Sequence, residues 1–234
     1  MAMTAREAAW TALQRWRKNG AWSDAALNAV LQSAQLEPRD AALAARICYG
    51  TLQNLTLLDH YLSVYCTTPL QKLEPKVLDL LRLSAYQIVL LDKVPPRAAV
   101  NEAVALCRKG GCARAAGLVN AVLRKACVYD LDKAVFKDEI EKLMVLGSAS
   151  REVAEFLHRH YPEEALGILT HTADGGMTSL RANPLKVSAA QLCELLMQNG
   201  AKSAEPGIVP GSVLARFEGS PAEQELFRQG YYHV

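Results

Sequence analysis

The sequence predicts a mainly α-helical protein: a bundle of about seven helices, then a helical bridge, then a small α/β unit. Apolar residues recur at spacings of three and four through the first ~130 residues, which is the period of an amphipathic helix. No convincing strand pattern occurs in that part, and the texture changes only at Met177. With 50% hydrophobic and 21% charged residues the composition is globular, which excludes a disordered chain.

Capping and helix-breaking residues set the first four helices. Thr4 and Glu7 form a capping box, in which each side chain bonds a backbone N–H at the start of a helix. Asn19-Gly20 ends that helix, and Pro38 fits the first turn of the third helix, where no backbone N–H is needed. The second helix is expected over about 23–34, the third carries apolar positions through Leu52, and the fourth is expected over 55–65.

The strongest helical pattern covers residues 74–91, where the apolar surface is wider than one stripe, so we expect this helix to be central and buried. Pro95-Pro96 breaks the pattern. Two further helices, 98–108 and 113–127, follow on either side of Gly110-Gly111.

Three residues inside these helices suggest contacts between helices. Gly50 costs about 1 kcal/mol of helix propensity, so we expect a close helix contact to require it. Asn101 and Asn120 lie in apolar stretches, and we expect their amides to be buried and to tie helices together rather than to contact RNA.

The last hundred residues predict a different organisation. Residues 134–172 predict one or two amphipathic helices that bridge two units, and a capping box of Ser188 and Gln191 opens a helix that Asn199-Gly200 closes. The other expected elements are a strand over 178–184, a strand over 212–217 and a short final helix opened by Ser220–Glu223, with Pro221 at its first position. The predicted domains are therefore 1–133, 134–172 and 173–234.

Charge is distributed unevenly along the chain. Residues 1–133 hold 17 Lys and Arg against 11 Asp and Glu, whereas residues 134–234 hold 9 against 13. A basic first half is compatible with a polyanionic partner such as RNA, although many domains with no such partner are mildly basic.

Motifs of common catalytic chemistries are missing from the sequence. It contains no Gly-rich nucleotide loop, no HExxH and no GxSxG, and its six Cys form no CxxC pair. His158 and His160 are two residues apart, so they face different sides of a helix and make poor joint metal ligands. We therefore expect no catalytic, cofactor or metal residue here. Scattered Cys without a secretory signal favour reduced thiols in the cytoplasm, and no apolar run is long enough to span a membrane.

Basic residues remain as candidates for binding nucleic acid, because Arg and Lys neutralise phosphates. The alternative is that they are solvated helix faces, or, for Lys125, a cation that favours the helix dipole at a C-terminus. The candidate RNA-binding residues are Arg6, Arg15, Arg17, Arg97, Arg108, Lys109, Arg114, Arg124 and Lys125.

Four segments carry a resemblance to a known family: Tyr49–Leu52, Leu83–Gln87, Val94–Val104 and Gly117–Arg124. They resemble the NusB-type helical domain, most closely the form fused to the front of the bacterial rRNA small-subunit methyltransferase B (Sun/Fmu) family. Leu180–Lys186 resembles the start of that family's small, RRM-like α/β region, which precedes the catalytic domain.

The resemblance implies a function for the longer parent protein. That family makes 5-methylcytosine in 16S rRNA with S-adenosylmethionine, using two Cys in Pro-Cys and Thr-Cys contexts. No Cys of this chain follows Pro or Thr, so no catalytic residue is carried over. We expect an RNA-docking front portion truncated before the catalytic domain, with the cofactor needed only by the full-length parent.

Two other functions stay open: a NusB-type antitermination module that binds RNA and protein, and a protein-interaction scaffold without a nucleic-acid role. The expected partner is 16S rRNA, with ribosomal proteins as a further possibility and no membrane. We expect a monomer in the cytoplasm.

Overall fold

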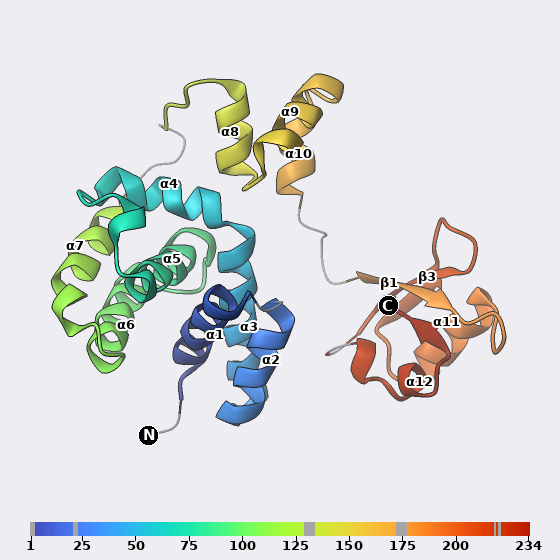
Figure 1. The fold of residues 1–234 in the computed structure, drawn as a ribbon. Helices are drawn as coiled ribbons and strands as arrows, with labels where there is room; N and C mark the ends of the chain where they lie inside the picture. Colours follow the sequence, from blue (N-terminus) through green and yellow to red (C-terminus); the bar gives the residue numbers. More distant parts are fainter. Residues whose placement is uncertain (1–2, 21–22, 129–133, 172–176, 218, 220) are drawn as a thin grey trace. The chain divides into compact units, whose positions relative to one another are not determined.

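The computed structural model describes residues 3–20, 23–128, 134–171, 177–217, 219 and 221–234. It divides into two compact units, Met1–Thr170 and His171–Val234. The first unit is helical and the second contains a small sheet (Figure 1). The mainly α fold class predicted from the sequence is confirmed.

The helical unit follows the predicted order closely. Pro75 and Pro96 stand in the first turn of α5 and α6, where a missing N–H costs nothing. The expected helix from residue 113 differs, because its first turn is the 3₁₀ helix η2. The elements are α1 (Ala5–Asn19), α2 (Ser23–Ala34), α3 (Pro38–Gln53), α4 (Leu55–Tyr65), η1 (Leu70–Lys72), α5 (Pro75–Leu90), α6 (Pro96–Lys109), η2 (Ala113–Ala115), α7 (Ala116–Ala126), α8 (Glu139–Leu146), α9 (Arg151–His160) and α10 (Ala165–Thr170).

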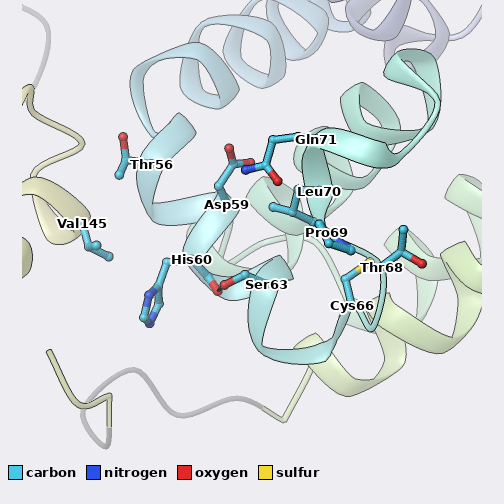
Figure 2. A pocket seen from close by; sticks show the side chains of 10 residues that line it. All are labelled: Thr56, Asp59, His60, Ser63, Cys66, Thr68, Pro69, Leu70, Gln71 and Val145. Atoms are coloured by element: carbon cyan, nitrogen blue, oxygen red, sulfur yellow. Dashed lines mark hydrogen bonds between the residues drawn. The ribbon is translucent and has the colours of Figure 1, made fainter. Parts of the chain in front are cut away.

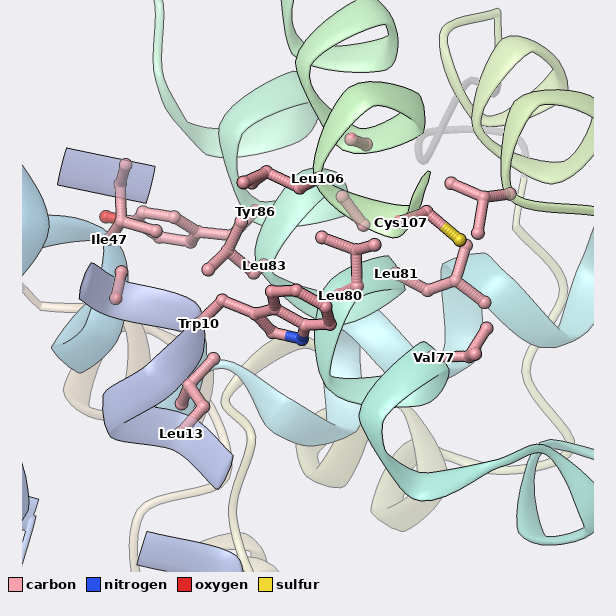
Figure 3. Packing of buried hydrophobic residues seen from close by; sticks show 14 of the residues in the cluster. Trp10, Leu13, Ile47, Val77, Leu80, Leu81, Leu83, Tyr86, Leu106 and Cys107 are labelled. Atoms are coloured by element: carbon pink, nitrogen blue, oxygen red, sulfur yellow. The ribbon is translucent and has the colours of Figure 1, made fainter. Parts of the chain in front are cut away.

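Helix α5 lies at the centre of the bundle, as its wide apolar surface predicts. It packs against α1, α3, α4, α6 and α7. Trp10 of α1 and Leu80 of α5 meet in this core, which Figure 3 shows from close by. The indole N–H of Trp10 donates to the Lys76 carbonyl oxygen over 2.9 Å, so the one polar atom of this buried ring has a partner.

At Gly50, α3 packs directly against the side chain of Tyr86 in α5. A Cβ atom built on Gly50 would lie 2.0 Å from Cζ of Tyr86. No side chain fits in that space, so the predicted close helix contact at Gly50 is confirmed and its partner is the Tyr86 ring.

Helices α8, α9 and α10 belong to the same unit as the bundle. Val145 of α8 packs with Leu57 and Tyr61 of α4, and the Leu57 backbone N–H donates to Ser148 Oγ over 3.2 Å. These contacts attach the three helices to the bundle through α4. Among the described residues no helix is long and apolar enough to cross a membrane.

The second unit is a four-stranded antiparallel sheet in the order β2-β3-β1-β4. The capping box of Ser188 and Gln191 is present at the start of its main helix. Alternate strand residues, such as Leu180 and Val213, face a small core with that helix. The elements are β1 (Met177–Ala182), α11 (Ala189–Gln198), β2 (Ser203–Pro206), β3 (Ser212–Arg216), η5 (Pro221–Glu223), α12 (Glu225–Arg228) and β4 (Tyr232–His233).

The sequence did not reveal β2 or β4, because each is too short to show alternation. The final helix is divided into η5 and α12, and Ser220 of its expected cap lies outside the described residues.

Candidate nucleic-acid interface

Two of the nine basic candidates bond to polar groups of the central helix. Arg6 Nε donates to Oε1 of Gln87 over 2.7 Å, and Arg17 Nε donates to Oδ2 of Asp79 over 2.8 Å. Gln87 and Asp79 are 1% and 3% exposed. A buried amide or carboxylate left without a partner is costly, so these arginines stabilise the packing of α1 on α5.

The carboxyl group of Asp79 is buried in α5 beside the Arg17 guanidinium. Burial raises its pKa above the ordinary value, and the Arg17 guanidinium beside it works in the opposite direction. Neither Asp79 nor Gln87 was predicted from the sequence. The available signal was a pair of polar residues inside the most apolar helix, where each needs a partner from another element.

Lys109 and Arg124 have polar partners at the surface. Lys109 Nζ lies 2.7 Å from Glu7 Oε2, which links the end of α6 to the start of α1. Glu7 was expected to complete the capping box; only its Thr4 half is found, with the Glu7 backbone N–H donating to Thr4 Oγ1. Arg124 Nε donates to Asn120 Oδ1 over 3.1 Å within α7 and stays exposed.

A hollow between helices α6 and α7 is lined by two of the candidate arginines. Arg97 and Arg124 line it, together with Asn101. Its volume is about 550 Å³, and we call it the α6–α7 hollow. Val100, Cys127 and Val128 complete its lining. Cationic and apolar groups side by side suit a nucleotide, which has a phosphate and a flat base.

The prediction that Asn101 is buried between helices is wrong, because its side chain is exposed at the α6–α7 hollow. The inward face of α6 is taken by Ala99, Val100 and Ala103, and the helical period turns Asn101 away from it. Asn120 is half-buried and accepts its bond from Arg124 of the same helix. Neither amide bonds to a second helix within the described residues.

The other four candidates have no bonded partner in the described part of the chain. Arg15, Arg108, Arg114 and Lys125 are exposed, and within the described part of the chain their side chains make no hydrogen bond or ion pair. Arg108 lies on the same outward face of α6 as Arg97 and Asn101, because residues four and seven apart share a helix face.

Arg114 lines another hollow, of about 520 Å³, beside η2. We call it the η2 hollow; Glu74, Val77 and Cys112 are among its lining residues. The carboxylate of Glu74 makes it a poorer site for phosphate than the α6–α7 hollow, which has no acidic lining residue.

The polar hollow on α4 has residue types that catalysis uses, but they are not arranged for it. It has a volume of about 370 Å³ and is lined by Asp59, His60, Ser63 and Cys66 (Figure 2). Arg82 holds Asp59 through two bonds of 2.7 and 2.6 Å, and the Ser63 hydroxyl donates to the His60 carbonyl oxygen. The pairing of nucleophile and base that acyl transfer needs is therefore not formed between these residues.

The His60 ring has an environment of its own. Burial lowers its pKa, and its ring centroid lies 5.5 Å from that of Phe136. Among the described residues, no group of three or more His, Cys, Asp or Glu is placed to hold a metal ion.

The chain is similar to proteins of known families. A model described as NusB family matches residues 3–127. The chain is 31% identical over 229 residues to the Bacillus subtilis (strain 168) protein named "Probable ribosomal RNA small subunit methyltransferase B", covering 96% of this chain and 50% of that protein. It is 28% identical over 119 residues to "Transcription antitermination protein NusB" of Coxiella burnetii (strain Dugway 5J108-111), covering 51% of this chain and 86% of that protein.

The crystal structure of PH0851 has a similar fold. Its TM-score is 0.68 at 17% identity, covering 100% of this chain and 52% of that one. The chain thus spans about half the length of the methyltransferase relative and of this solved structure.

Proposed function

The chain belongs to the NusB family, and from this we propose that it is the RNA-binding portion of a ribosomal RNA cytosine-5 methyltransferase. In this proposal it docks 16S rRNA so that a separate catalytic region can transfer the methyl group from S-adenosylmethionine. Ribosomal RNA is its partner in the cytoplasm, and the methylation belongs to the longer protein.

The extent of the similarity carries this proposal. The match to the Bacillus subtilis protein covers 96% of the chain and so includes both compact units. The match to the Coxiella burnetii antitermination protein covers 51% and leaves the rest without a counterpart. A function that uses both units therefore accounts for more of the chain than antitermination does.

The domain roles follow the sequence division. Residues 1–133 would bind RNA, residues 134–172 would link, and residues 173–234 would form the small unit in front of the catalytic region. The described part of the small unit does not fit S-adenosylmethionine, because β1 leads to α11 through Asn183-Pro184 and not through a Gly-rich turn.

The α6–α7 hollow is the proposed centre of the RNA interface. Arg97 and Arg124 would neutralise phosphates, and the exposed Val128 would receive the flat face of a base. Asn101 carries both a donor and an acceptor for a base edge. Arg108 extends the cationic face along α6, and the basic balance of residues 1–133 attracts the polyanion from a distance.

Arg6 and Arg17 are expected to contribute less to RNA binding in this proposal than the sequence suggests. Both guanidiniums bond to buried groups of α5. Either arginine could contact RNA only through guanidinium N–H groups that do not take part in these bonds.

Filter binding of the full chain to 16S and 23S rRNA tests the docking role. We expect tighter binding to 16S rRNA at the same salt concentration, since phosphate contacts alone carry no preference. Equal affinity for both RNAs, together with recovery of transcription factors from a lysate, would favour the antitermination function instead.

A further inference from the structure

Two buried cysteines face each other where α6 ends and the chain turns toward η2. The Sγ atoms of Cys107 and Cys112 are 3.2 Å apart, and the two residues are 0% and 4% exposed. Each sulfur also lies within hydrogen-bond distance of the other residue's backbone carbonyl oxygen, at 2.9 and 3.2 Å. The side chains are thus held in direct contact and not merely near one another.

Tertiary contacts fix the turn between the two cysteines. A Cβ atom on Gly110 would lie 2.3 Å from the Trp10 ring, so the turn packs directly on the indole. Gly111 has φ +75°, which favours glycine, and its carbonyl oxygen accepts from Lys76 Nζ over 2.8 Å. The fold therefore sets the position of Cys112 relative to Cys107.

The two sulfurs differ in their surroundings. Cys112 lines the η2 hollow, which gives a small solute a route to it. Cys107 lies deeper, among core residues such as Leu81 (Figure 3). Burial raises the pKa of Cys107 to about 12, so it is a neutral thiol at ordinary pH. A reaction with an oxidant would therefore begin at Cys112.

We propose that Cys107 and Cys112 are a redox modification site, at which a peroxide converts the two thiols of the folded chain into an intrachain disulfide. The inference does not depend on RNA binding. The Cys112 thiol loses its proton, and its sulfur attacks one oxygen of hydrogen peroxide. The O–O bond breaks, a sulfenic acid forms, and the released hydroxide takes the proton as water.

Cys107 completes the reaction. Its sulfur attacks the Cys112 sulfur and displaces hydroxide, which takes up the Cys107 proton as a second water. Two thiols and one peroxide thus give one disulfide and two waters. The sulfurs must approach from 3.2 Å to about 2.05 Å, a movement the six-residue segment has to accommodate. The bond would close a ring around Arg108 and Lys109.

Peptide mass spectrometry of the full chain tests the proposal. Trypsin cuts after Arg97, Arg108, Lys109 and Arg114, so the two cysteines fall in separate peptides, 98–108 and 110–114. After hydrogen peroxide and alkylation without reductant, we expect these peptides to remain joined and dithiothreitol to separate them. Cys193→Ser, in the other unit, should give the same joined pair.

Cys112→Ser should abolish the joined pair and leave Cys107 open to alkylation after unfolding, with circular dichroism confirming that the variant is helical. The proposal is overturned if both thiols stay free at a peroxide dose that oxidises the partly exposed Cys193. It is equally overturned if Cys112 proceeds to sulfinic acid without the link, or if either cysteine joins a different partner.

Discussion

The guanidinium of Arg17 lies 2.8 Å from Oδ2 of Asp79, whose side chain is only 4% exposed in the central helix α5. Arg17 reaches Asp79 from α1, and its own side chain is 29% exposed. The bond joins the outer helix to the buried one, and it supplies the counter-charge that a buried carboxylate requires.

Replacing Arg17 by Ala should therefore destabilise the chain. Loss of one partner leaves the Asp79 charge uncompensated, and because Arg17 is partly solvated we expect a loss of about 2 kcal/mol in the free energy of unfolding. Arg15→Ala is the matched control: Arg15 is exposed in the same helix without a bonded partner, so its loss should stay within about 0.5 kcal/mol. Urea unfolding measures both, and equal effects would contradict the structural role.

The cost of Arg17→Ala should also depend on pH. The pKa of Asp79 is raised by burial, so the folded state binds its proton more tightly than the unfolded state, and ionisation costs stability as pH rises from 3.8 through the raised value. Removing Arg17 raises this pKa further. The destabilisation should be largest near pH 7 and smaller near pH 4.5, where a larger fraction of Asp79 carries its proton. Urea unfolding of both proteins at the two pH values checks this, and a constant difference would rule it out.

Gly50→Ala should destabilise the contact between α3 and α5. A methyl group 2.0 Å from the Tyr86 ring forces the buried ring or one of the two helices to move, which typically costs about 1–3 kcal/mol. In a Tyr86→Ala background the same change should become neutral or stabilising, because alanine favours a helix over glycine by about 1 kcal/mol.

Gly117→Ala in α7 provides the comparison for this steric argument. Nothing lies within 4 Å of a Cβ atom at Gly117, so the change should stabilise the chain by a few tenths of a kcal/mol to about 1. Thermal unfolding of the wild type, the three single variants and the double variant measures the signs. A Gly50→Ala penalty that persists without the Tyr86 ring would mean that the close contact is not its cause.

The sequence predicted the parts of this fold that local signals determine. The bounds of α1 follow from Thr4 and from Asn19-Gly20, and the central place of α5 follows from its wide apolar surface. Gly50 could be identified as a contact point because an interior glycine has a known cost, although its partner Tyr86 could not.

The rest depended on tertiary structure. Asn101 lies in an apolar stretch, yet its position on the helix turns it outward, and the stretch alone does not show which side is buried. Likewise, nothing local distinguishes Arg17, which pairs with a buried carboxylate, from Arg15, which is exposed two residues earlier. Strand β4 has two residues and exists only through its pairing with β1.

The sequence predicted which Arg and Lys residues could bind RNA, but not how these residues are arranged in space. The nine candidates include the two that line the α6–α7 hollow, but they also include Arg6, Arg17 and Lys109, whose partners are other parts of the chain. The residues that line the hollow can be told from those bonded within the chain only when the packing of α1 on α5 and of α6 on α7 is known.

The proposal that the α6–α7 hollow holds RNA phosphates is tested most directly by the salt dependence of binding. The affinity of the chain for a 16S rRNA fragment is measured over a series of salt concentrations for the wild type, Arg97→Ala, Arg124→Ala and Arg228→Ala. Arg228 is an exposed cation of the second unit and serves as the control of equal charge.

We predict that log affinity falls linearly with log salt for the wild type. Arg97→Ala and Arg124→Ala should each reduce the steepness of that slope by about 0.7–0.9, the value for one lost phosphate contact, whereas Arg228→Ala should leave it unchanged. A wild-type affinity that does not vary with salt, or three variants with the same slope as the wild type, would contradict the account.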